Sequence, residues 1–260
     1  MRINKDLLFV IGFAGLAACV GYNYTYGTKS IQRLEKSTNI SITPSSSDNS
    51  TDMKQFLLDN PTAIIDSLEN YKTEMMANQE KEIQTQIVKN YDKIYSDNSF
   101  TIGNPDAEIK IVEFFDYKCG YCKVAAKTIE KLVAENPNVQ VYMKDMPILS
   151  EASMEAAKAA VAAGFLGKYK EYSKALMETK DELNEETFRK IAKEVGVDGN
   201  ELIEMTNSEK VSELLMENRM AATIVGLQGT PTILIEGTTY RGDFSLGSLQ
   251  EAIRTEMEAK

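Results

Sequence analysis

The sequence of 260 residues contains no histidine and only three cysteines, Cys19, Cys119 and Cys122. Without histidine, the chain cannot form a Ser-His or Cys-His catalytic pair, a His-ligated metal site or a histidine pH switch. Three cysteines are too few for a small secreted domain that is stabilised by several disulfides. Positive charge is also scarce, since the formal net charge is −10. Nucleic acid and anionic lipid surfaces are therefore not expected as partners, because both attract basic patches.

The first 27 residues have the composition of an export signal or a membrane anchor. Two basic residues precede an apolar stretch from Leu7 to Val20, which is shorter than the roughly 20 residues of a typical transmembrane helix. Leu16-Ala17-Ala18-Cys19 resembles a bacterial lipobox, so Cys19 is a candidate lipidation site. The alternative is an uncleaved anchor helix that extends to Tyr26. In either case we expect a membrane tether outside the cytoplasm.

Two segments follow the anchor. Residues 28–51 are rich in Ser, Thr and Asn, which indicates a flexible linker. Residues 52–97 have a helical pattern, longer than one small domain can cover, with an apolar stripe that consists of Ile64, Leu68, Tyr71, Met75, Ile83, Ile87, Tyr91 and Ile94. We expect this stripe to contact another copy of the chain and form a homo-oligomer. The alternative is that the segment breaks and folds back onto its own domain.

The remaining residues, 98–260, alternate between strand and helix patterns and predict one α/β domain. Ile109–Phe115 is an apolar run typical of a buried strand, and a helical pattern begins at Cys119. Residues 150–226 show helical patterns only, and a strand pattern returns at Thr232–Glu236. The sequence therefore predicts an all-helical insertion between strands of one sheet.

A Cys-x-x-Cys pair at a strand-to-helix junction is the arrangement of a thiol–disulfide active site. Cys119 is the candidate nucleophile, because N–H groups at a helix N-terminus favour a thiolate. Cys122 is expected to be more buried and to resolve the mixed disulfide, and Gly120 and Tyr121 between the cysteines would let a substrate sulfur approach. A structural disulfide and half of a zinc site are the alternatives. Zinc needs four ligands, so we expect no metal, and we expect no other cofactor.

Other residues near these motifs are candidates for the same site. Glu113 interrupts the apolar strand, where a buried carboxylate is costly unless it has a function. It could relay the proton of Cys122, or it could be solvated at the sheet edge. Lys144 on the neighbouring strand is its candidate ion-pair partner. Thr230 and Pro231 precede the later strand, where a cis bond would present the Thr230 backbone to a bound peptide.

Together these motifs resemble the DsbA-like branch of the thioredoxin superfamily, and in particular proteins of the ScsC and Com type. The resemblance rests mainly on Phe114–Cys122 and Gly229–Thr232, and it extends over residues 52–258. It implies a thioredoxin fold with a helical insertion.

The resemblance also implies the roles of individual residues. Cys119 would be the attacking cysteine and Cys122 the resolving one, Pro231 would be cis, and Glu113 matches a buried acidic residue of DsbA relatives. Cys-Gly-Tyr-Cys is similar to the site of the DsbC isomerase, and Thr230 before the proline also resembles isomerases. The histidine that DsbA carries between its cysteines is absent, which argues against strong oxidising power.

We therefore expect a periplasmic, membrane-tethered and oligomeric thiol–disulfide isomerase or reductase. Its partners would be disulfide-bonded client proteins and a membrane redox partner. One alternative is a monomeric DsbA-type oxidase, which would have a markedly less negative reduction potential. The other is a non-catalytic surface antigen whose cysteines are vestigial.

Overall fold

The computed structural model describes residues 49–258, and these divide between residues 70 and 71 into two units. The expected anchor, with Cys19, and all of the expected linker before residue 49 lie outside the described residues. In the first unit, α2 (Asn49–Asp59) ends just before Asn60-Pro61. Just after it begins α3 (Ala63–Lys89), most of whose residues belong to the second unit. This break follows from Pro61, which lacks an N–H donor and disfavours helical backbone at the preceding residue. Among residues 49–258, no helix has both the length and the apolar character that a membrane span requires.

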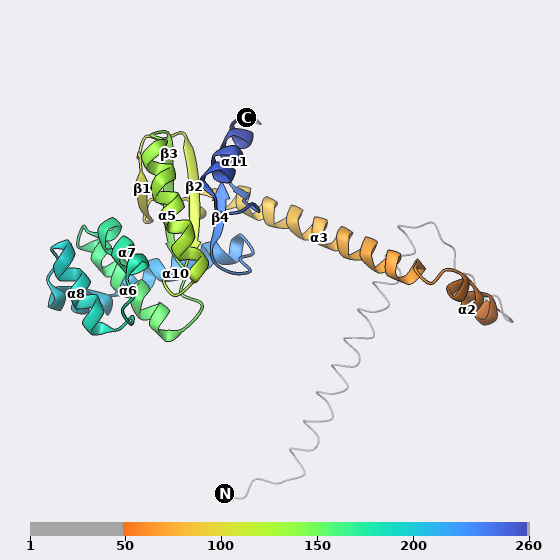
Figure 1. Cartoon of the computed structure of the whole chain (residues 1–260), viewed down its shortest axis with the longest axis horizontal. Coiled ribbons are helices and arrows are strands. Elements are labelled where there is room, and N and C mark those ends of the chain that lie inside the picture. The colour runs from red at the N-terminus through yellow and green to blue at the C-terminus, as the bar shows by residue number, and fades with distance from the viewer. Residues whose placement is uncertain (1–48, 259–260) are drawn as a thin grey trace, which may run out of the picture. The chain divides into compact units, whose positions relative to one another are not determined.

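The second unit is built on one five-stranded sheet with the strand order β1-β3-β2-β4-β5 (Figure 1). The strands are β1 (Phe100–Gly103), β2 (Ile109–Phe115), β3 (Val139–Asp145), β4 (Thr232–Ile235) and β5 (Thr238–Thr239). The central pair, β2 and β3, is parallel and is joined by α5 (Gly120–Glu135), whereas the other neighbouring strands are antiparallel. The sheet therefore has one β-α-β unit at its centre, as the sequence pattern predicts.

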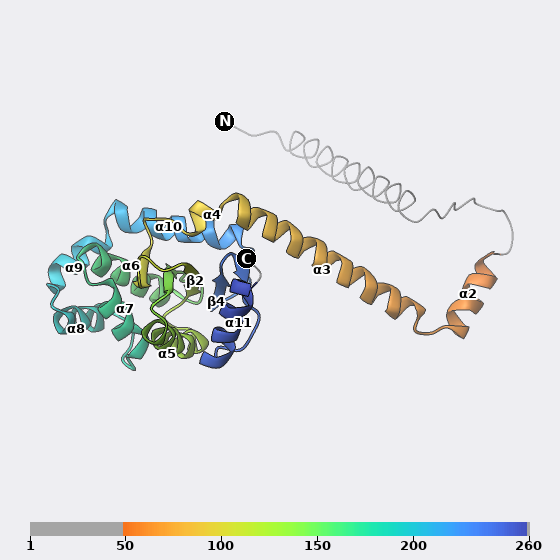
Figure 2. The same ribbon diagram turned by 90° about the horizontal axis from the view of Figure 1, so that it is seen from above.

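Helices cover both faces of this sheet (Figure 2). On one face, Ile111 and Phe115 of β2 belong to a core with α5 and α11 (Leu246–Glu258). On the other face, Val112 and Phe114 pack with α10 (Glu209–Ile224), α4 (Tyr91–Ile94) and the C-terminal end of α3. Successive residues of a strand point to opposite faces, so a strand that is covered on both sides has to be apolar almost throughout.

The stretch between β3 and β4 forms the expected helical insertion. It consists of α6 (Glu151–Phe165), α7 (Tyr169–Glu178), α8 (Glu185–Val195), α9 (Gly199–Thr206) and α10. The buried alanines of α6 allow α7, α9 and α10 to pack closely around it. Asn184 caps α8 by accepting the Thr187 N–H, and Gly196 ends this helix in the left-handed conformation, with φ 82°. The sequence predicts both boundaries of α8.

The apolar stripe of residues 52–97 has two environments. Ile87 and Ile94 are buried on the α10 face of the sheet, and Ile83 and Tyr91 pack partly against the same core. The N-terminal part of the stripe is different, since more than half of each side chain is exposed at Ile64, Leu68, Tyr71 and Met75. The C-terminal part therefore folds back on its own domain, as in the alternative, while the N-terminal part lacks an apolar partner among the described residues.

Lys144 is not the ion-pair partner of Glu113. In the register of β2 and β3, Lys144 lies beside Phe114, whereas Glu113 lies beside Met143, so the two charged side chains project from opposite faces. The Lys144 Nζ donates instead to Ser99 Oγ at 2.6 Å. Burial lowers the pKa of Lys144 to about 8. The ion-pair hypothesis is wrong because it did not take the strand register into account.

Candidate functional site

The loop between β2 and α5 is held in place by Asp116. Its buried carboxylate accepts the Lys118 N–H at 2.8 Å. It also accepts the N–H groups of Ile148 and Leu149, at 2.9 and 3.0 Å. Asp116 therefore connects the loop that carries the first cysteine with the segment that follows β3. The sequence analysis did not select this residue, although an aspartate three positions before the cysteine pair was a visible signal.

Cys119 is the N-cap of α5, and its sulfur lies between two elements. The Sγ accepts the backbone N–H of Cys122 at 3.4 Å and donates to the carbonyl oxygen of Thr230 at 3.3 Å. Both cysteines are free thiols. Cys119 is 8% exposed and Cys122 is fully buried. Burial raises the pKa of the Cys122 thiol. The Cys119 sulfur is thus the more accessible of the two, which is compatible with the expected roles of an attacking and a resolving cysteine.

The Thr230–Pro231 bond is cis, as the resemblance implies. Sheet register explains why this bond lies beside the cysteines. β4 is antiparallel to β2, and Thr232 at its start pairs with Phe114 at the end of β2. The loop before β4 therefore meets the loop after β2, and the Thr230 carbonyl reaches the Cys119 sulfur.

Glu113 is buried and faces a small cavity. Both of its carboxylate oxygens lack a hydrogen-bond partner among the described residues. The cavity of about 50 Å³ is lined by Glu113 and by residues of α5 and α7, including Ala126, Tyr169 and Ser173. Burial raises the pKa of Glu113 to about 8. Ala126 lies one helical turn after Cys122, so Glu113 faces the side of α5 that carries the second cysteine.

A buried polar network links the loop between β2 and α5, residues 116–119, to the helical insertion. This loop carries Cys119 and is called the redox loop below. The Tyr117 hydroxyl donates to Asp145 Oδ1 at 2.7 Å, and the Tyr169 hydroxyl donates to Asp145 Oδ2 at 2.6 Å. Tyr117 also lies 3.0 Å from the hydroxyl of Ser173. Burial raises the pKa of Asp145 to about 6. The sequence analysis missed this network, because it depends on β3 and α7 meeting in three dimensions.

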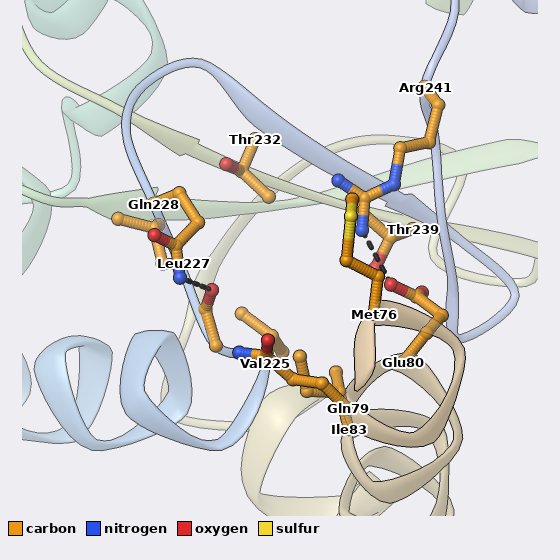
Figure 3. Close-up of a pocket in the computed structure, with 11 residues that line it drawn as sticks. Met76, Gln79, Glu80, Ile83, Val225, Leu227, Gln228, Thr232, Thr239 and Arg241 are labelled. Atoms are coloured by element: carbon orange, nitrogen blue, oxygen red, sulfur yellow. Dashed lines mark hydrogen bonds and ion pairs between the residues drawn. The ribbon is translucent and has the colours of Figure 1, made fainter. Parts of the chain in front are cut away.

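A cleft of about 260 Å³ lies next to the cis-proline loop (Figure 3). Met76 and Glu80 rise from α3 toward Arg241, which forms an ion pair with Glu80 at 2.7 Å. The opposite wall includes Gly226, where an added Cβ would lie only 2.7 Å from Cδ1 of Ile83. Gly226 also has φ +61°, so glycine is needed both for the backbone and for this close approach. Through this wall, α3 contacts the segment that leads into the cis-proline loop.

Solved structures that are similar to this chain include two thiol–disulfide proteins or their domains. A thioredoxin-like oxidoreductase from Silicibacter pomeroyi is 34% identical, with a TM-score of 0.62, and the match covers 65% of this chain and 98% of that one. The catalytic domain of Proteus mirabilis ScsC is 26% identical, with a TM-score of 0.60, and the match covers 68% and 99% of the two chains. These matches confirm the expected thioredoxin fold and the resemblance to ScsC.

Curated relatives include proteins of different architecture. A probable disulfide bond formation protein D from Bacillus anthracis is 27% identical over 171 residues, which are 61% of this chain and 78% of the relative. A Na(+)/H(+) antiporter, NhaA 3 of Salinispora tropica, is 24% identical over 159 residues. The match covers 60% of this chain, but this chain spans only 24% of the antiporter's length.

The family model of the DSBA-like thioredoxin domain matches residues 110–254. This range is more than half of the chain, and it contains Glu113, Cys119, Cys122 and the cis proline. It also contains the helical insertion between β3 and β4. The chain therefore belongs to the family of DSBA-like thioredoxin domains.

Proposed function

We propose that this protein is an exported thiol–disulfide oxidoreductase whose Cys119–Cys122 couple exchanges with cysteines of disulfide-bonded client proteins. The observation that carries the proposal is the position of the Cys119 sulfur, between the Cys122 N–H and the Thr230 carbonyl. The apolar N-terminal stretch supports a periplasmic location with a membrane tether, either through lipidated Cys19 or through an uncleaved anchor.

The exchange proceeds in two steps. The Cys119 thiolate attacks one sulfur of a client disulfide, and the other client sulfur leaves as a thiolate. Cys122 then loses its proton and attacks the Cys119 sulfur, which releases the client thiol and leaves a Cys119–Cys122 disulfide. In an isomerase cycle, a different client thiolate instead attacks the client sulfur that is bonded to Cys119. A new client disulfide forms, the bond to Cys119 breaks, and Cys119 leaves as a thiolate, so the protein returns to its dithiol form. The backbone of Thr230, with Gly120 and Tyr121, would hold the client segment beside Cys119.

Glu113 is the proposed acceptor for the Cys122 proton. Its carboxylate has no protein hydrogen-bond partner among the described residues, and the cavity beside it is large enough to hold water. With a pKa of about 8, it exchanges protons in the pH range in which thiols react. A water molecule in the cavity would carry the proton between α5 and Glu113.

We propose that the physiological direction is isomerisation or reduction, with a membrane redox partner that maintains the dithiol. The alternatives are a DsbA-type oxidase and a surface antigen with inactive cysteines. We expect a reduction potential closer to the roughly −180 mV of protein disulfide isomerase than to the roughly −120 mV of DsbA. We also expect refolding of scrambled ribonuclease without an added oxidant. A potential near that of DsbA would favour the oxidase, and no exchange with any substrate would favour the antigen.

We also propose a homo-oligomer, on the basis of the exposed apolar residues of α2 and α3. Phe56, Leu58, Ile64 and Leu68 are each more than half exposed. Residues 63–79 of α3 are largely exposed and, at about 1.5 Å per residue, extend over about 25 Å, which leaves room for a helical interface. Ile87 and Ile94 are core residues, so a deletion of residues 52–97 would damage the fold, and substitutions are the better test.

Replacing Ile64 and Leu68 with glutamine is expected to convert an oligomer into a monomer. These residues are one helical turn apart and share a face, so the double variant removes the centre of the apolar surface. Sedimentation of the chain from residue 49 onward measures the mass. We expect the variant to reduce insulin normally but to lose activity on scrambled ribonuclease. Val88→Gln is the matched control, because Val88 is also an exposed apolar residue of α3 but lies about 200° around the helix from Leu68. A monomeric wild-type protein would contradict the proposal.

A further inference from the structure

We infer that a lysine-lined groove beside the redox loop binds an acidic, extended segment of the client protein. The inference rests on the proposed function and names a feature of its substrate. The groove has a volume of about 770 Å³. One wall is formed by the redox loop and the first turns of α5, and the other by residues 177–183, at the end of α7 and in the loop that follows.

The groove starts next to the nucleophile. Tyr117 and Lys118 line it and directly precede Cys119 in the chain. The Lys123 Nζ donates to the carbonyl oxygen of Thr179 at 3.2 Å, which connects the two walls. Of the described residues, none from the cis-proline loop lines this groove. In a client whose cysteine is bonded to Cys119, the residues on one side of that cysteine would therefore contact the cis-proline loop, and those on the other side would contact this groove.

Positive charge is concentrated in the groove. It contains Lys118, Lys123, Lys127 and Lys180, and within residues 49–258 none of these lysines forms an ion pair. This concentration is unusual for a chain with a net charge of −10. The ammonium groups of Lys118, Lys127 and Lys180 are therefore available to an anionic ligand, and that of Lys123 keeps further N–H donors besides the one bonded to Thr179.

The acidic side chains of the groove compensate only part of this charge. Glu178 lies 3.6 Å from Lys174, and Asp181 lies 2.8 Å from Lys190. Neither of these two lysines lines the groove. Lys174 lies closer to Glu130, at 2.5 Å, so Glu178 is neutralised only in part. Among the described residues that line the groove, four lysines outnumber the three acidic residues, one of which is paired with a lysine outside the groove, so the local charge is positive.

The spacing of the lysines fits an extended peptide. Lys123 and Lys127 are four residues apart on α5, which is about 6 Å along the helix axis. In an extended chain, alternate side chains point the same way and repeat at about 6.6 Å. Aspartate or glutamate at alternate positions would therefore meet successive lysines. Once the client is attached to Cys119, these contacts are intramolecular, which favours them further.

Local attraction should exceed the repulsion between an acidic client and the acidic protein. The Debye length is about 10 Å at 0.1 M salt, so distant charges are screened while contacts within the groove are not. An exposed ion pair typically changes a rate or binding constant by about twofold. Three such pairs would give a preference of about fivefold to tenfold.

The test uses three peptides, each with one cysteine activated as a 2-pyridyl disulfide. Aspartate, asparagine or lysine occupies alternate positions on both sides of the cysteine. The Cys119 thiolate attacks the peptide sulfur and releases 2-thiopyridone, which is measured by absorbance. Cys122 then attacks the Cys119 sulfur and frees the peptide thiol, so the peptide is reduced and the protein dithiol is oxidised. Rates with dithiothreitol correct for the intrinsic reactivity of each peptide.

We expect the acidic peptide to react about fivefold faster than the neutral peptide at about 0.1 M salt, and equally fast at about 1 M. Lys127→Glu with Lys180→Glu should reduce the ratio of the two rates to one or less. The matched control is Lys131→Glu with Lys193→Glu, which makes the same change in net charge outside the groove and should keep the ratio.

Two results would overturn the inference, and they are distinguishable. If the dithiol reacts with no peptide, the proposed function fails and the inference fails with it. If it reacts with the acidic and neutral peptides equally at low salt, or if the groove variant keeps the wild-type ratio, the inference alone fails.

Discussion

Replacing Cys119 with serine is expected to abolish thiol–disulfide exchange, so that insulin is reduced no faster than in the absence of the protein. Cys119 is the more exposed thiol and lies at the N-terminus of α5 beside Thr230. A serine hydroxyl at this position cannot form a mixed disulfide. Cys122 cannot substitute for Cys119, because it is fully buried and its thiol pKa is raised by burial.

Replacing Cys122 with serine is expected to give a different defect. Cys119 can still attack the client, but no second thiol can release it, so a covalent protein–client adduct accumulates. The adduct should appear as a heavier band on a non-reducing gel and disappear with dithiothreitol. A chain that begins at residue 49 contains only these two cysteines, so the site of attachment is unambiguous.

Matched unfolding curves control for misfolding. Serine and cysteine have similar volumes, so both variants should unfold at nearly the same denaturant concentration as the reduced wild-type protein. If Cys119→Ser retained activity, or if Cys122→Ser formed no adduct with a client that the wild-type protein reduces, the roles of attacking and resolving cysteine would be reversed or absent.

Local sequence signals were sufficient for the elements that position the cysteines. The apolar run from Ile109 to Phe115 is β2, with the predicted bounds. The predicted helix starts immediately after Cys119, and Cys119 itself caps it. These features depend on residues close together in the chain, such as an apolar strand followed by a turn and an N-cap.

The errors and omissions all depend on long-range packing. The Lys144 hypothesis requires the register of β2 against β3, which the sequence does not specify. Asp116 is visible beside the cysteine pair, but its bonds to the segment after β3 depend on the folded chain. The role of Asp145 is evident only after β3 and α7 meet in three dimensions. The apolar stripe of residues 52–97 recurs on both sides of a gap at Asn78-Gln79, yet only its C-terminal part meets α10 and the sheet. Periodicity identifies an apolar face, but it does not identify what covers that face.

Replacing Glu113 with glutamine is expected to stabilise the reduced protein by about 3 kcal/mol at pH 7. Burial raises the pKa of Glu113 from 4.5 to about 8. Between these values the folded protein keeps the proton and the unfolded chain releases it. The folded state then binds more protons than the unfolded state, so the free energy of unfolding falls as pH rises. Glutamine has nearly the same shape and does not ionise.

The predicted stabilisation has a definite pH profile. It should be near zero below pH 4.5, grow by about 1.4 kcal/mol per pH unit up to about pH 8, and stay constant above that pH. Urea denaturation of the reduced protein between pH 4 and pH 9 measures it. Glu204→Gln is the matched control, because it makes the same chemical change at an exposed position of α9.

A second measurement separates a proton acceptor from a residue that merely destabilises the fold. If Glu113 takes the proton of Cys122, Glu113→Gln should lengthen the lifetime of the mixed disulfide, and the effect should depend on pH. Attack by Cys119 on the client should be unaffected. Equal pH slopes of stability in the wild type and the variant would mean that the Glu113 carboxylate is hydrated through its cavity and ionises without penalty. If the variant is more stable but the lifetime of its mixed disulfide is unchanged, the wild-type Glu113 carboxyl is buried and neutral, but it does not accept the proton of Cys122.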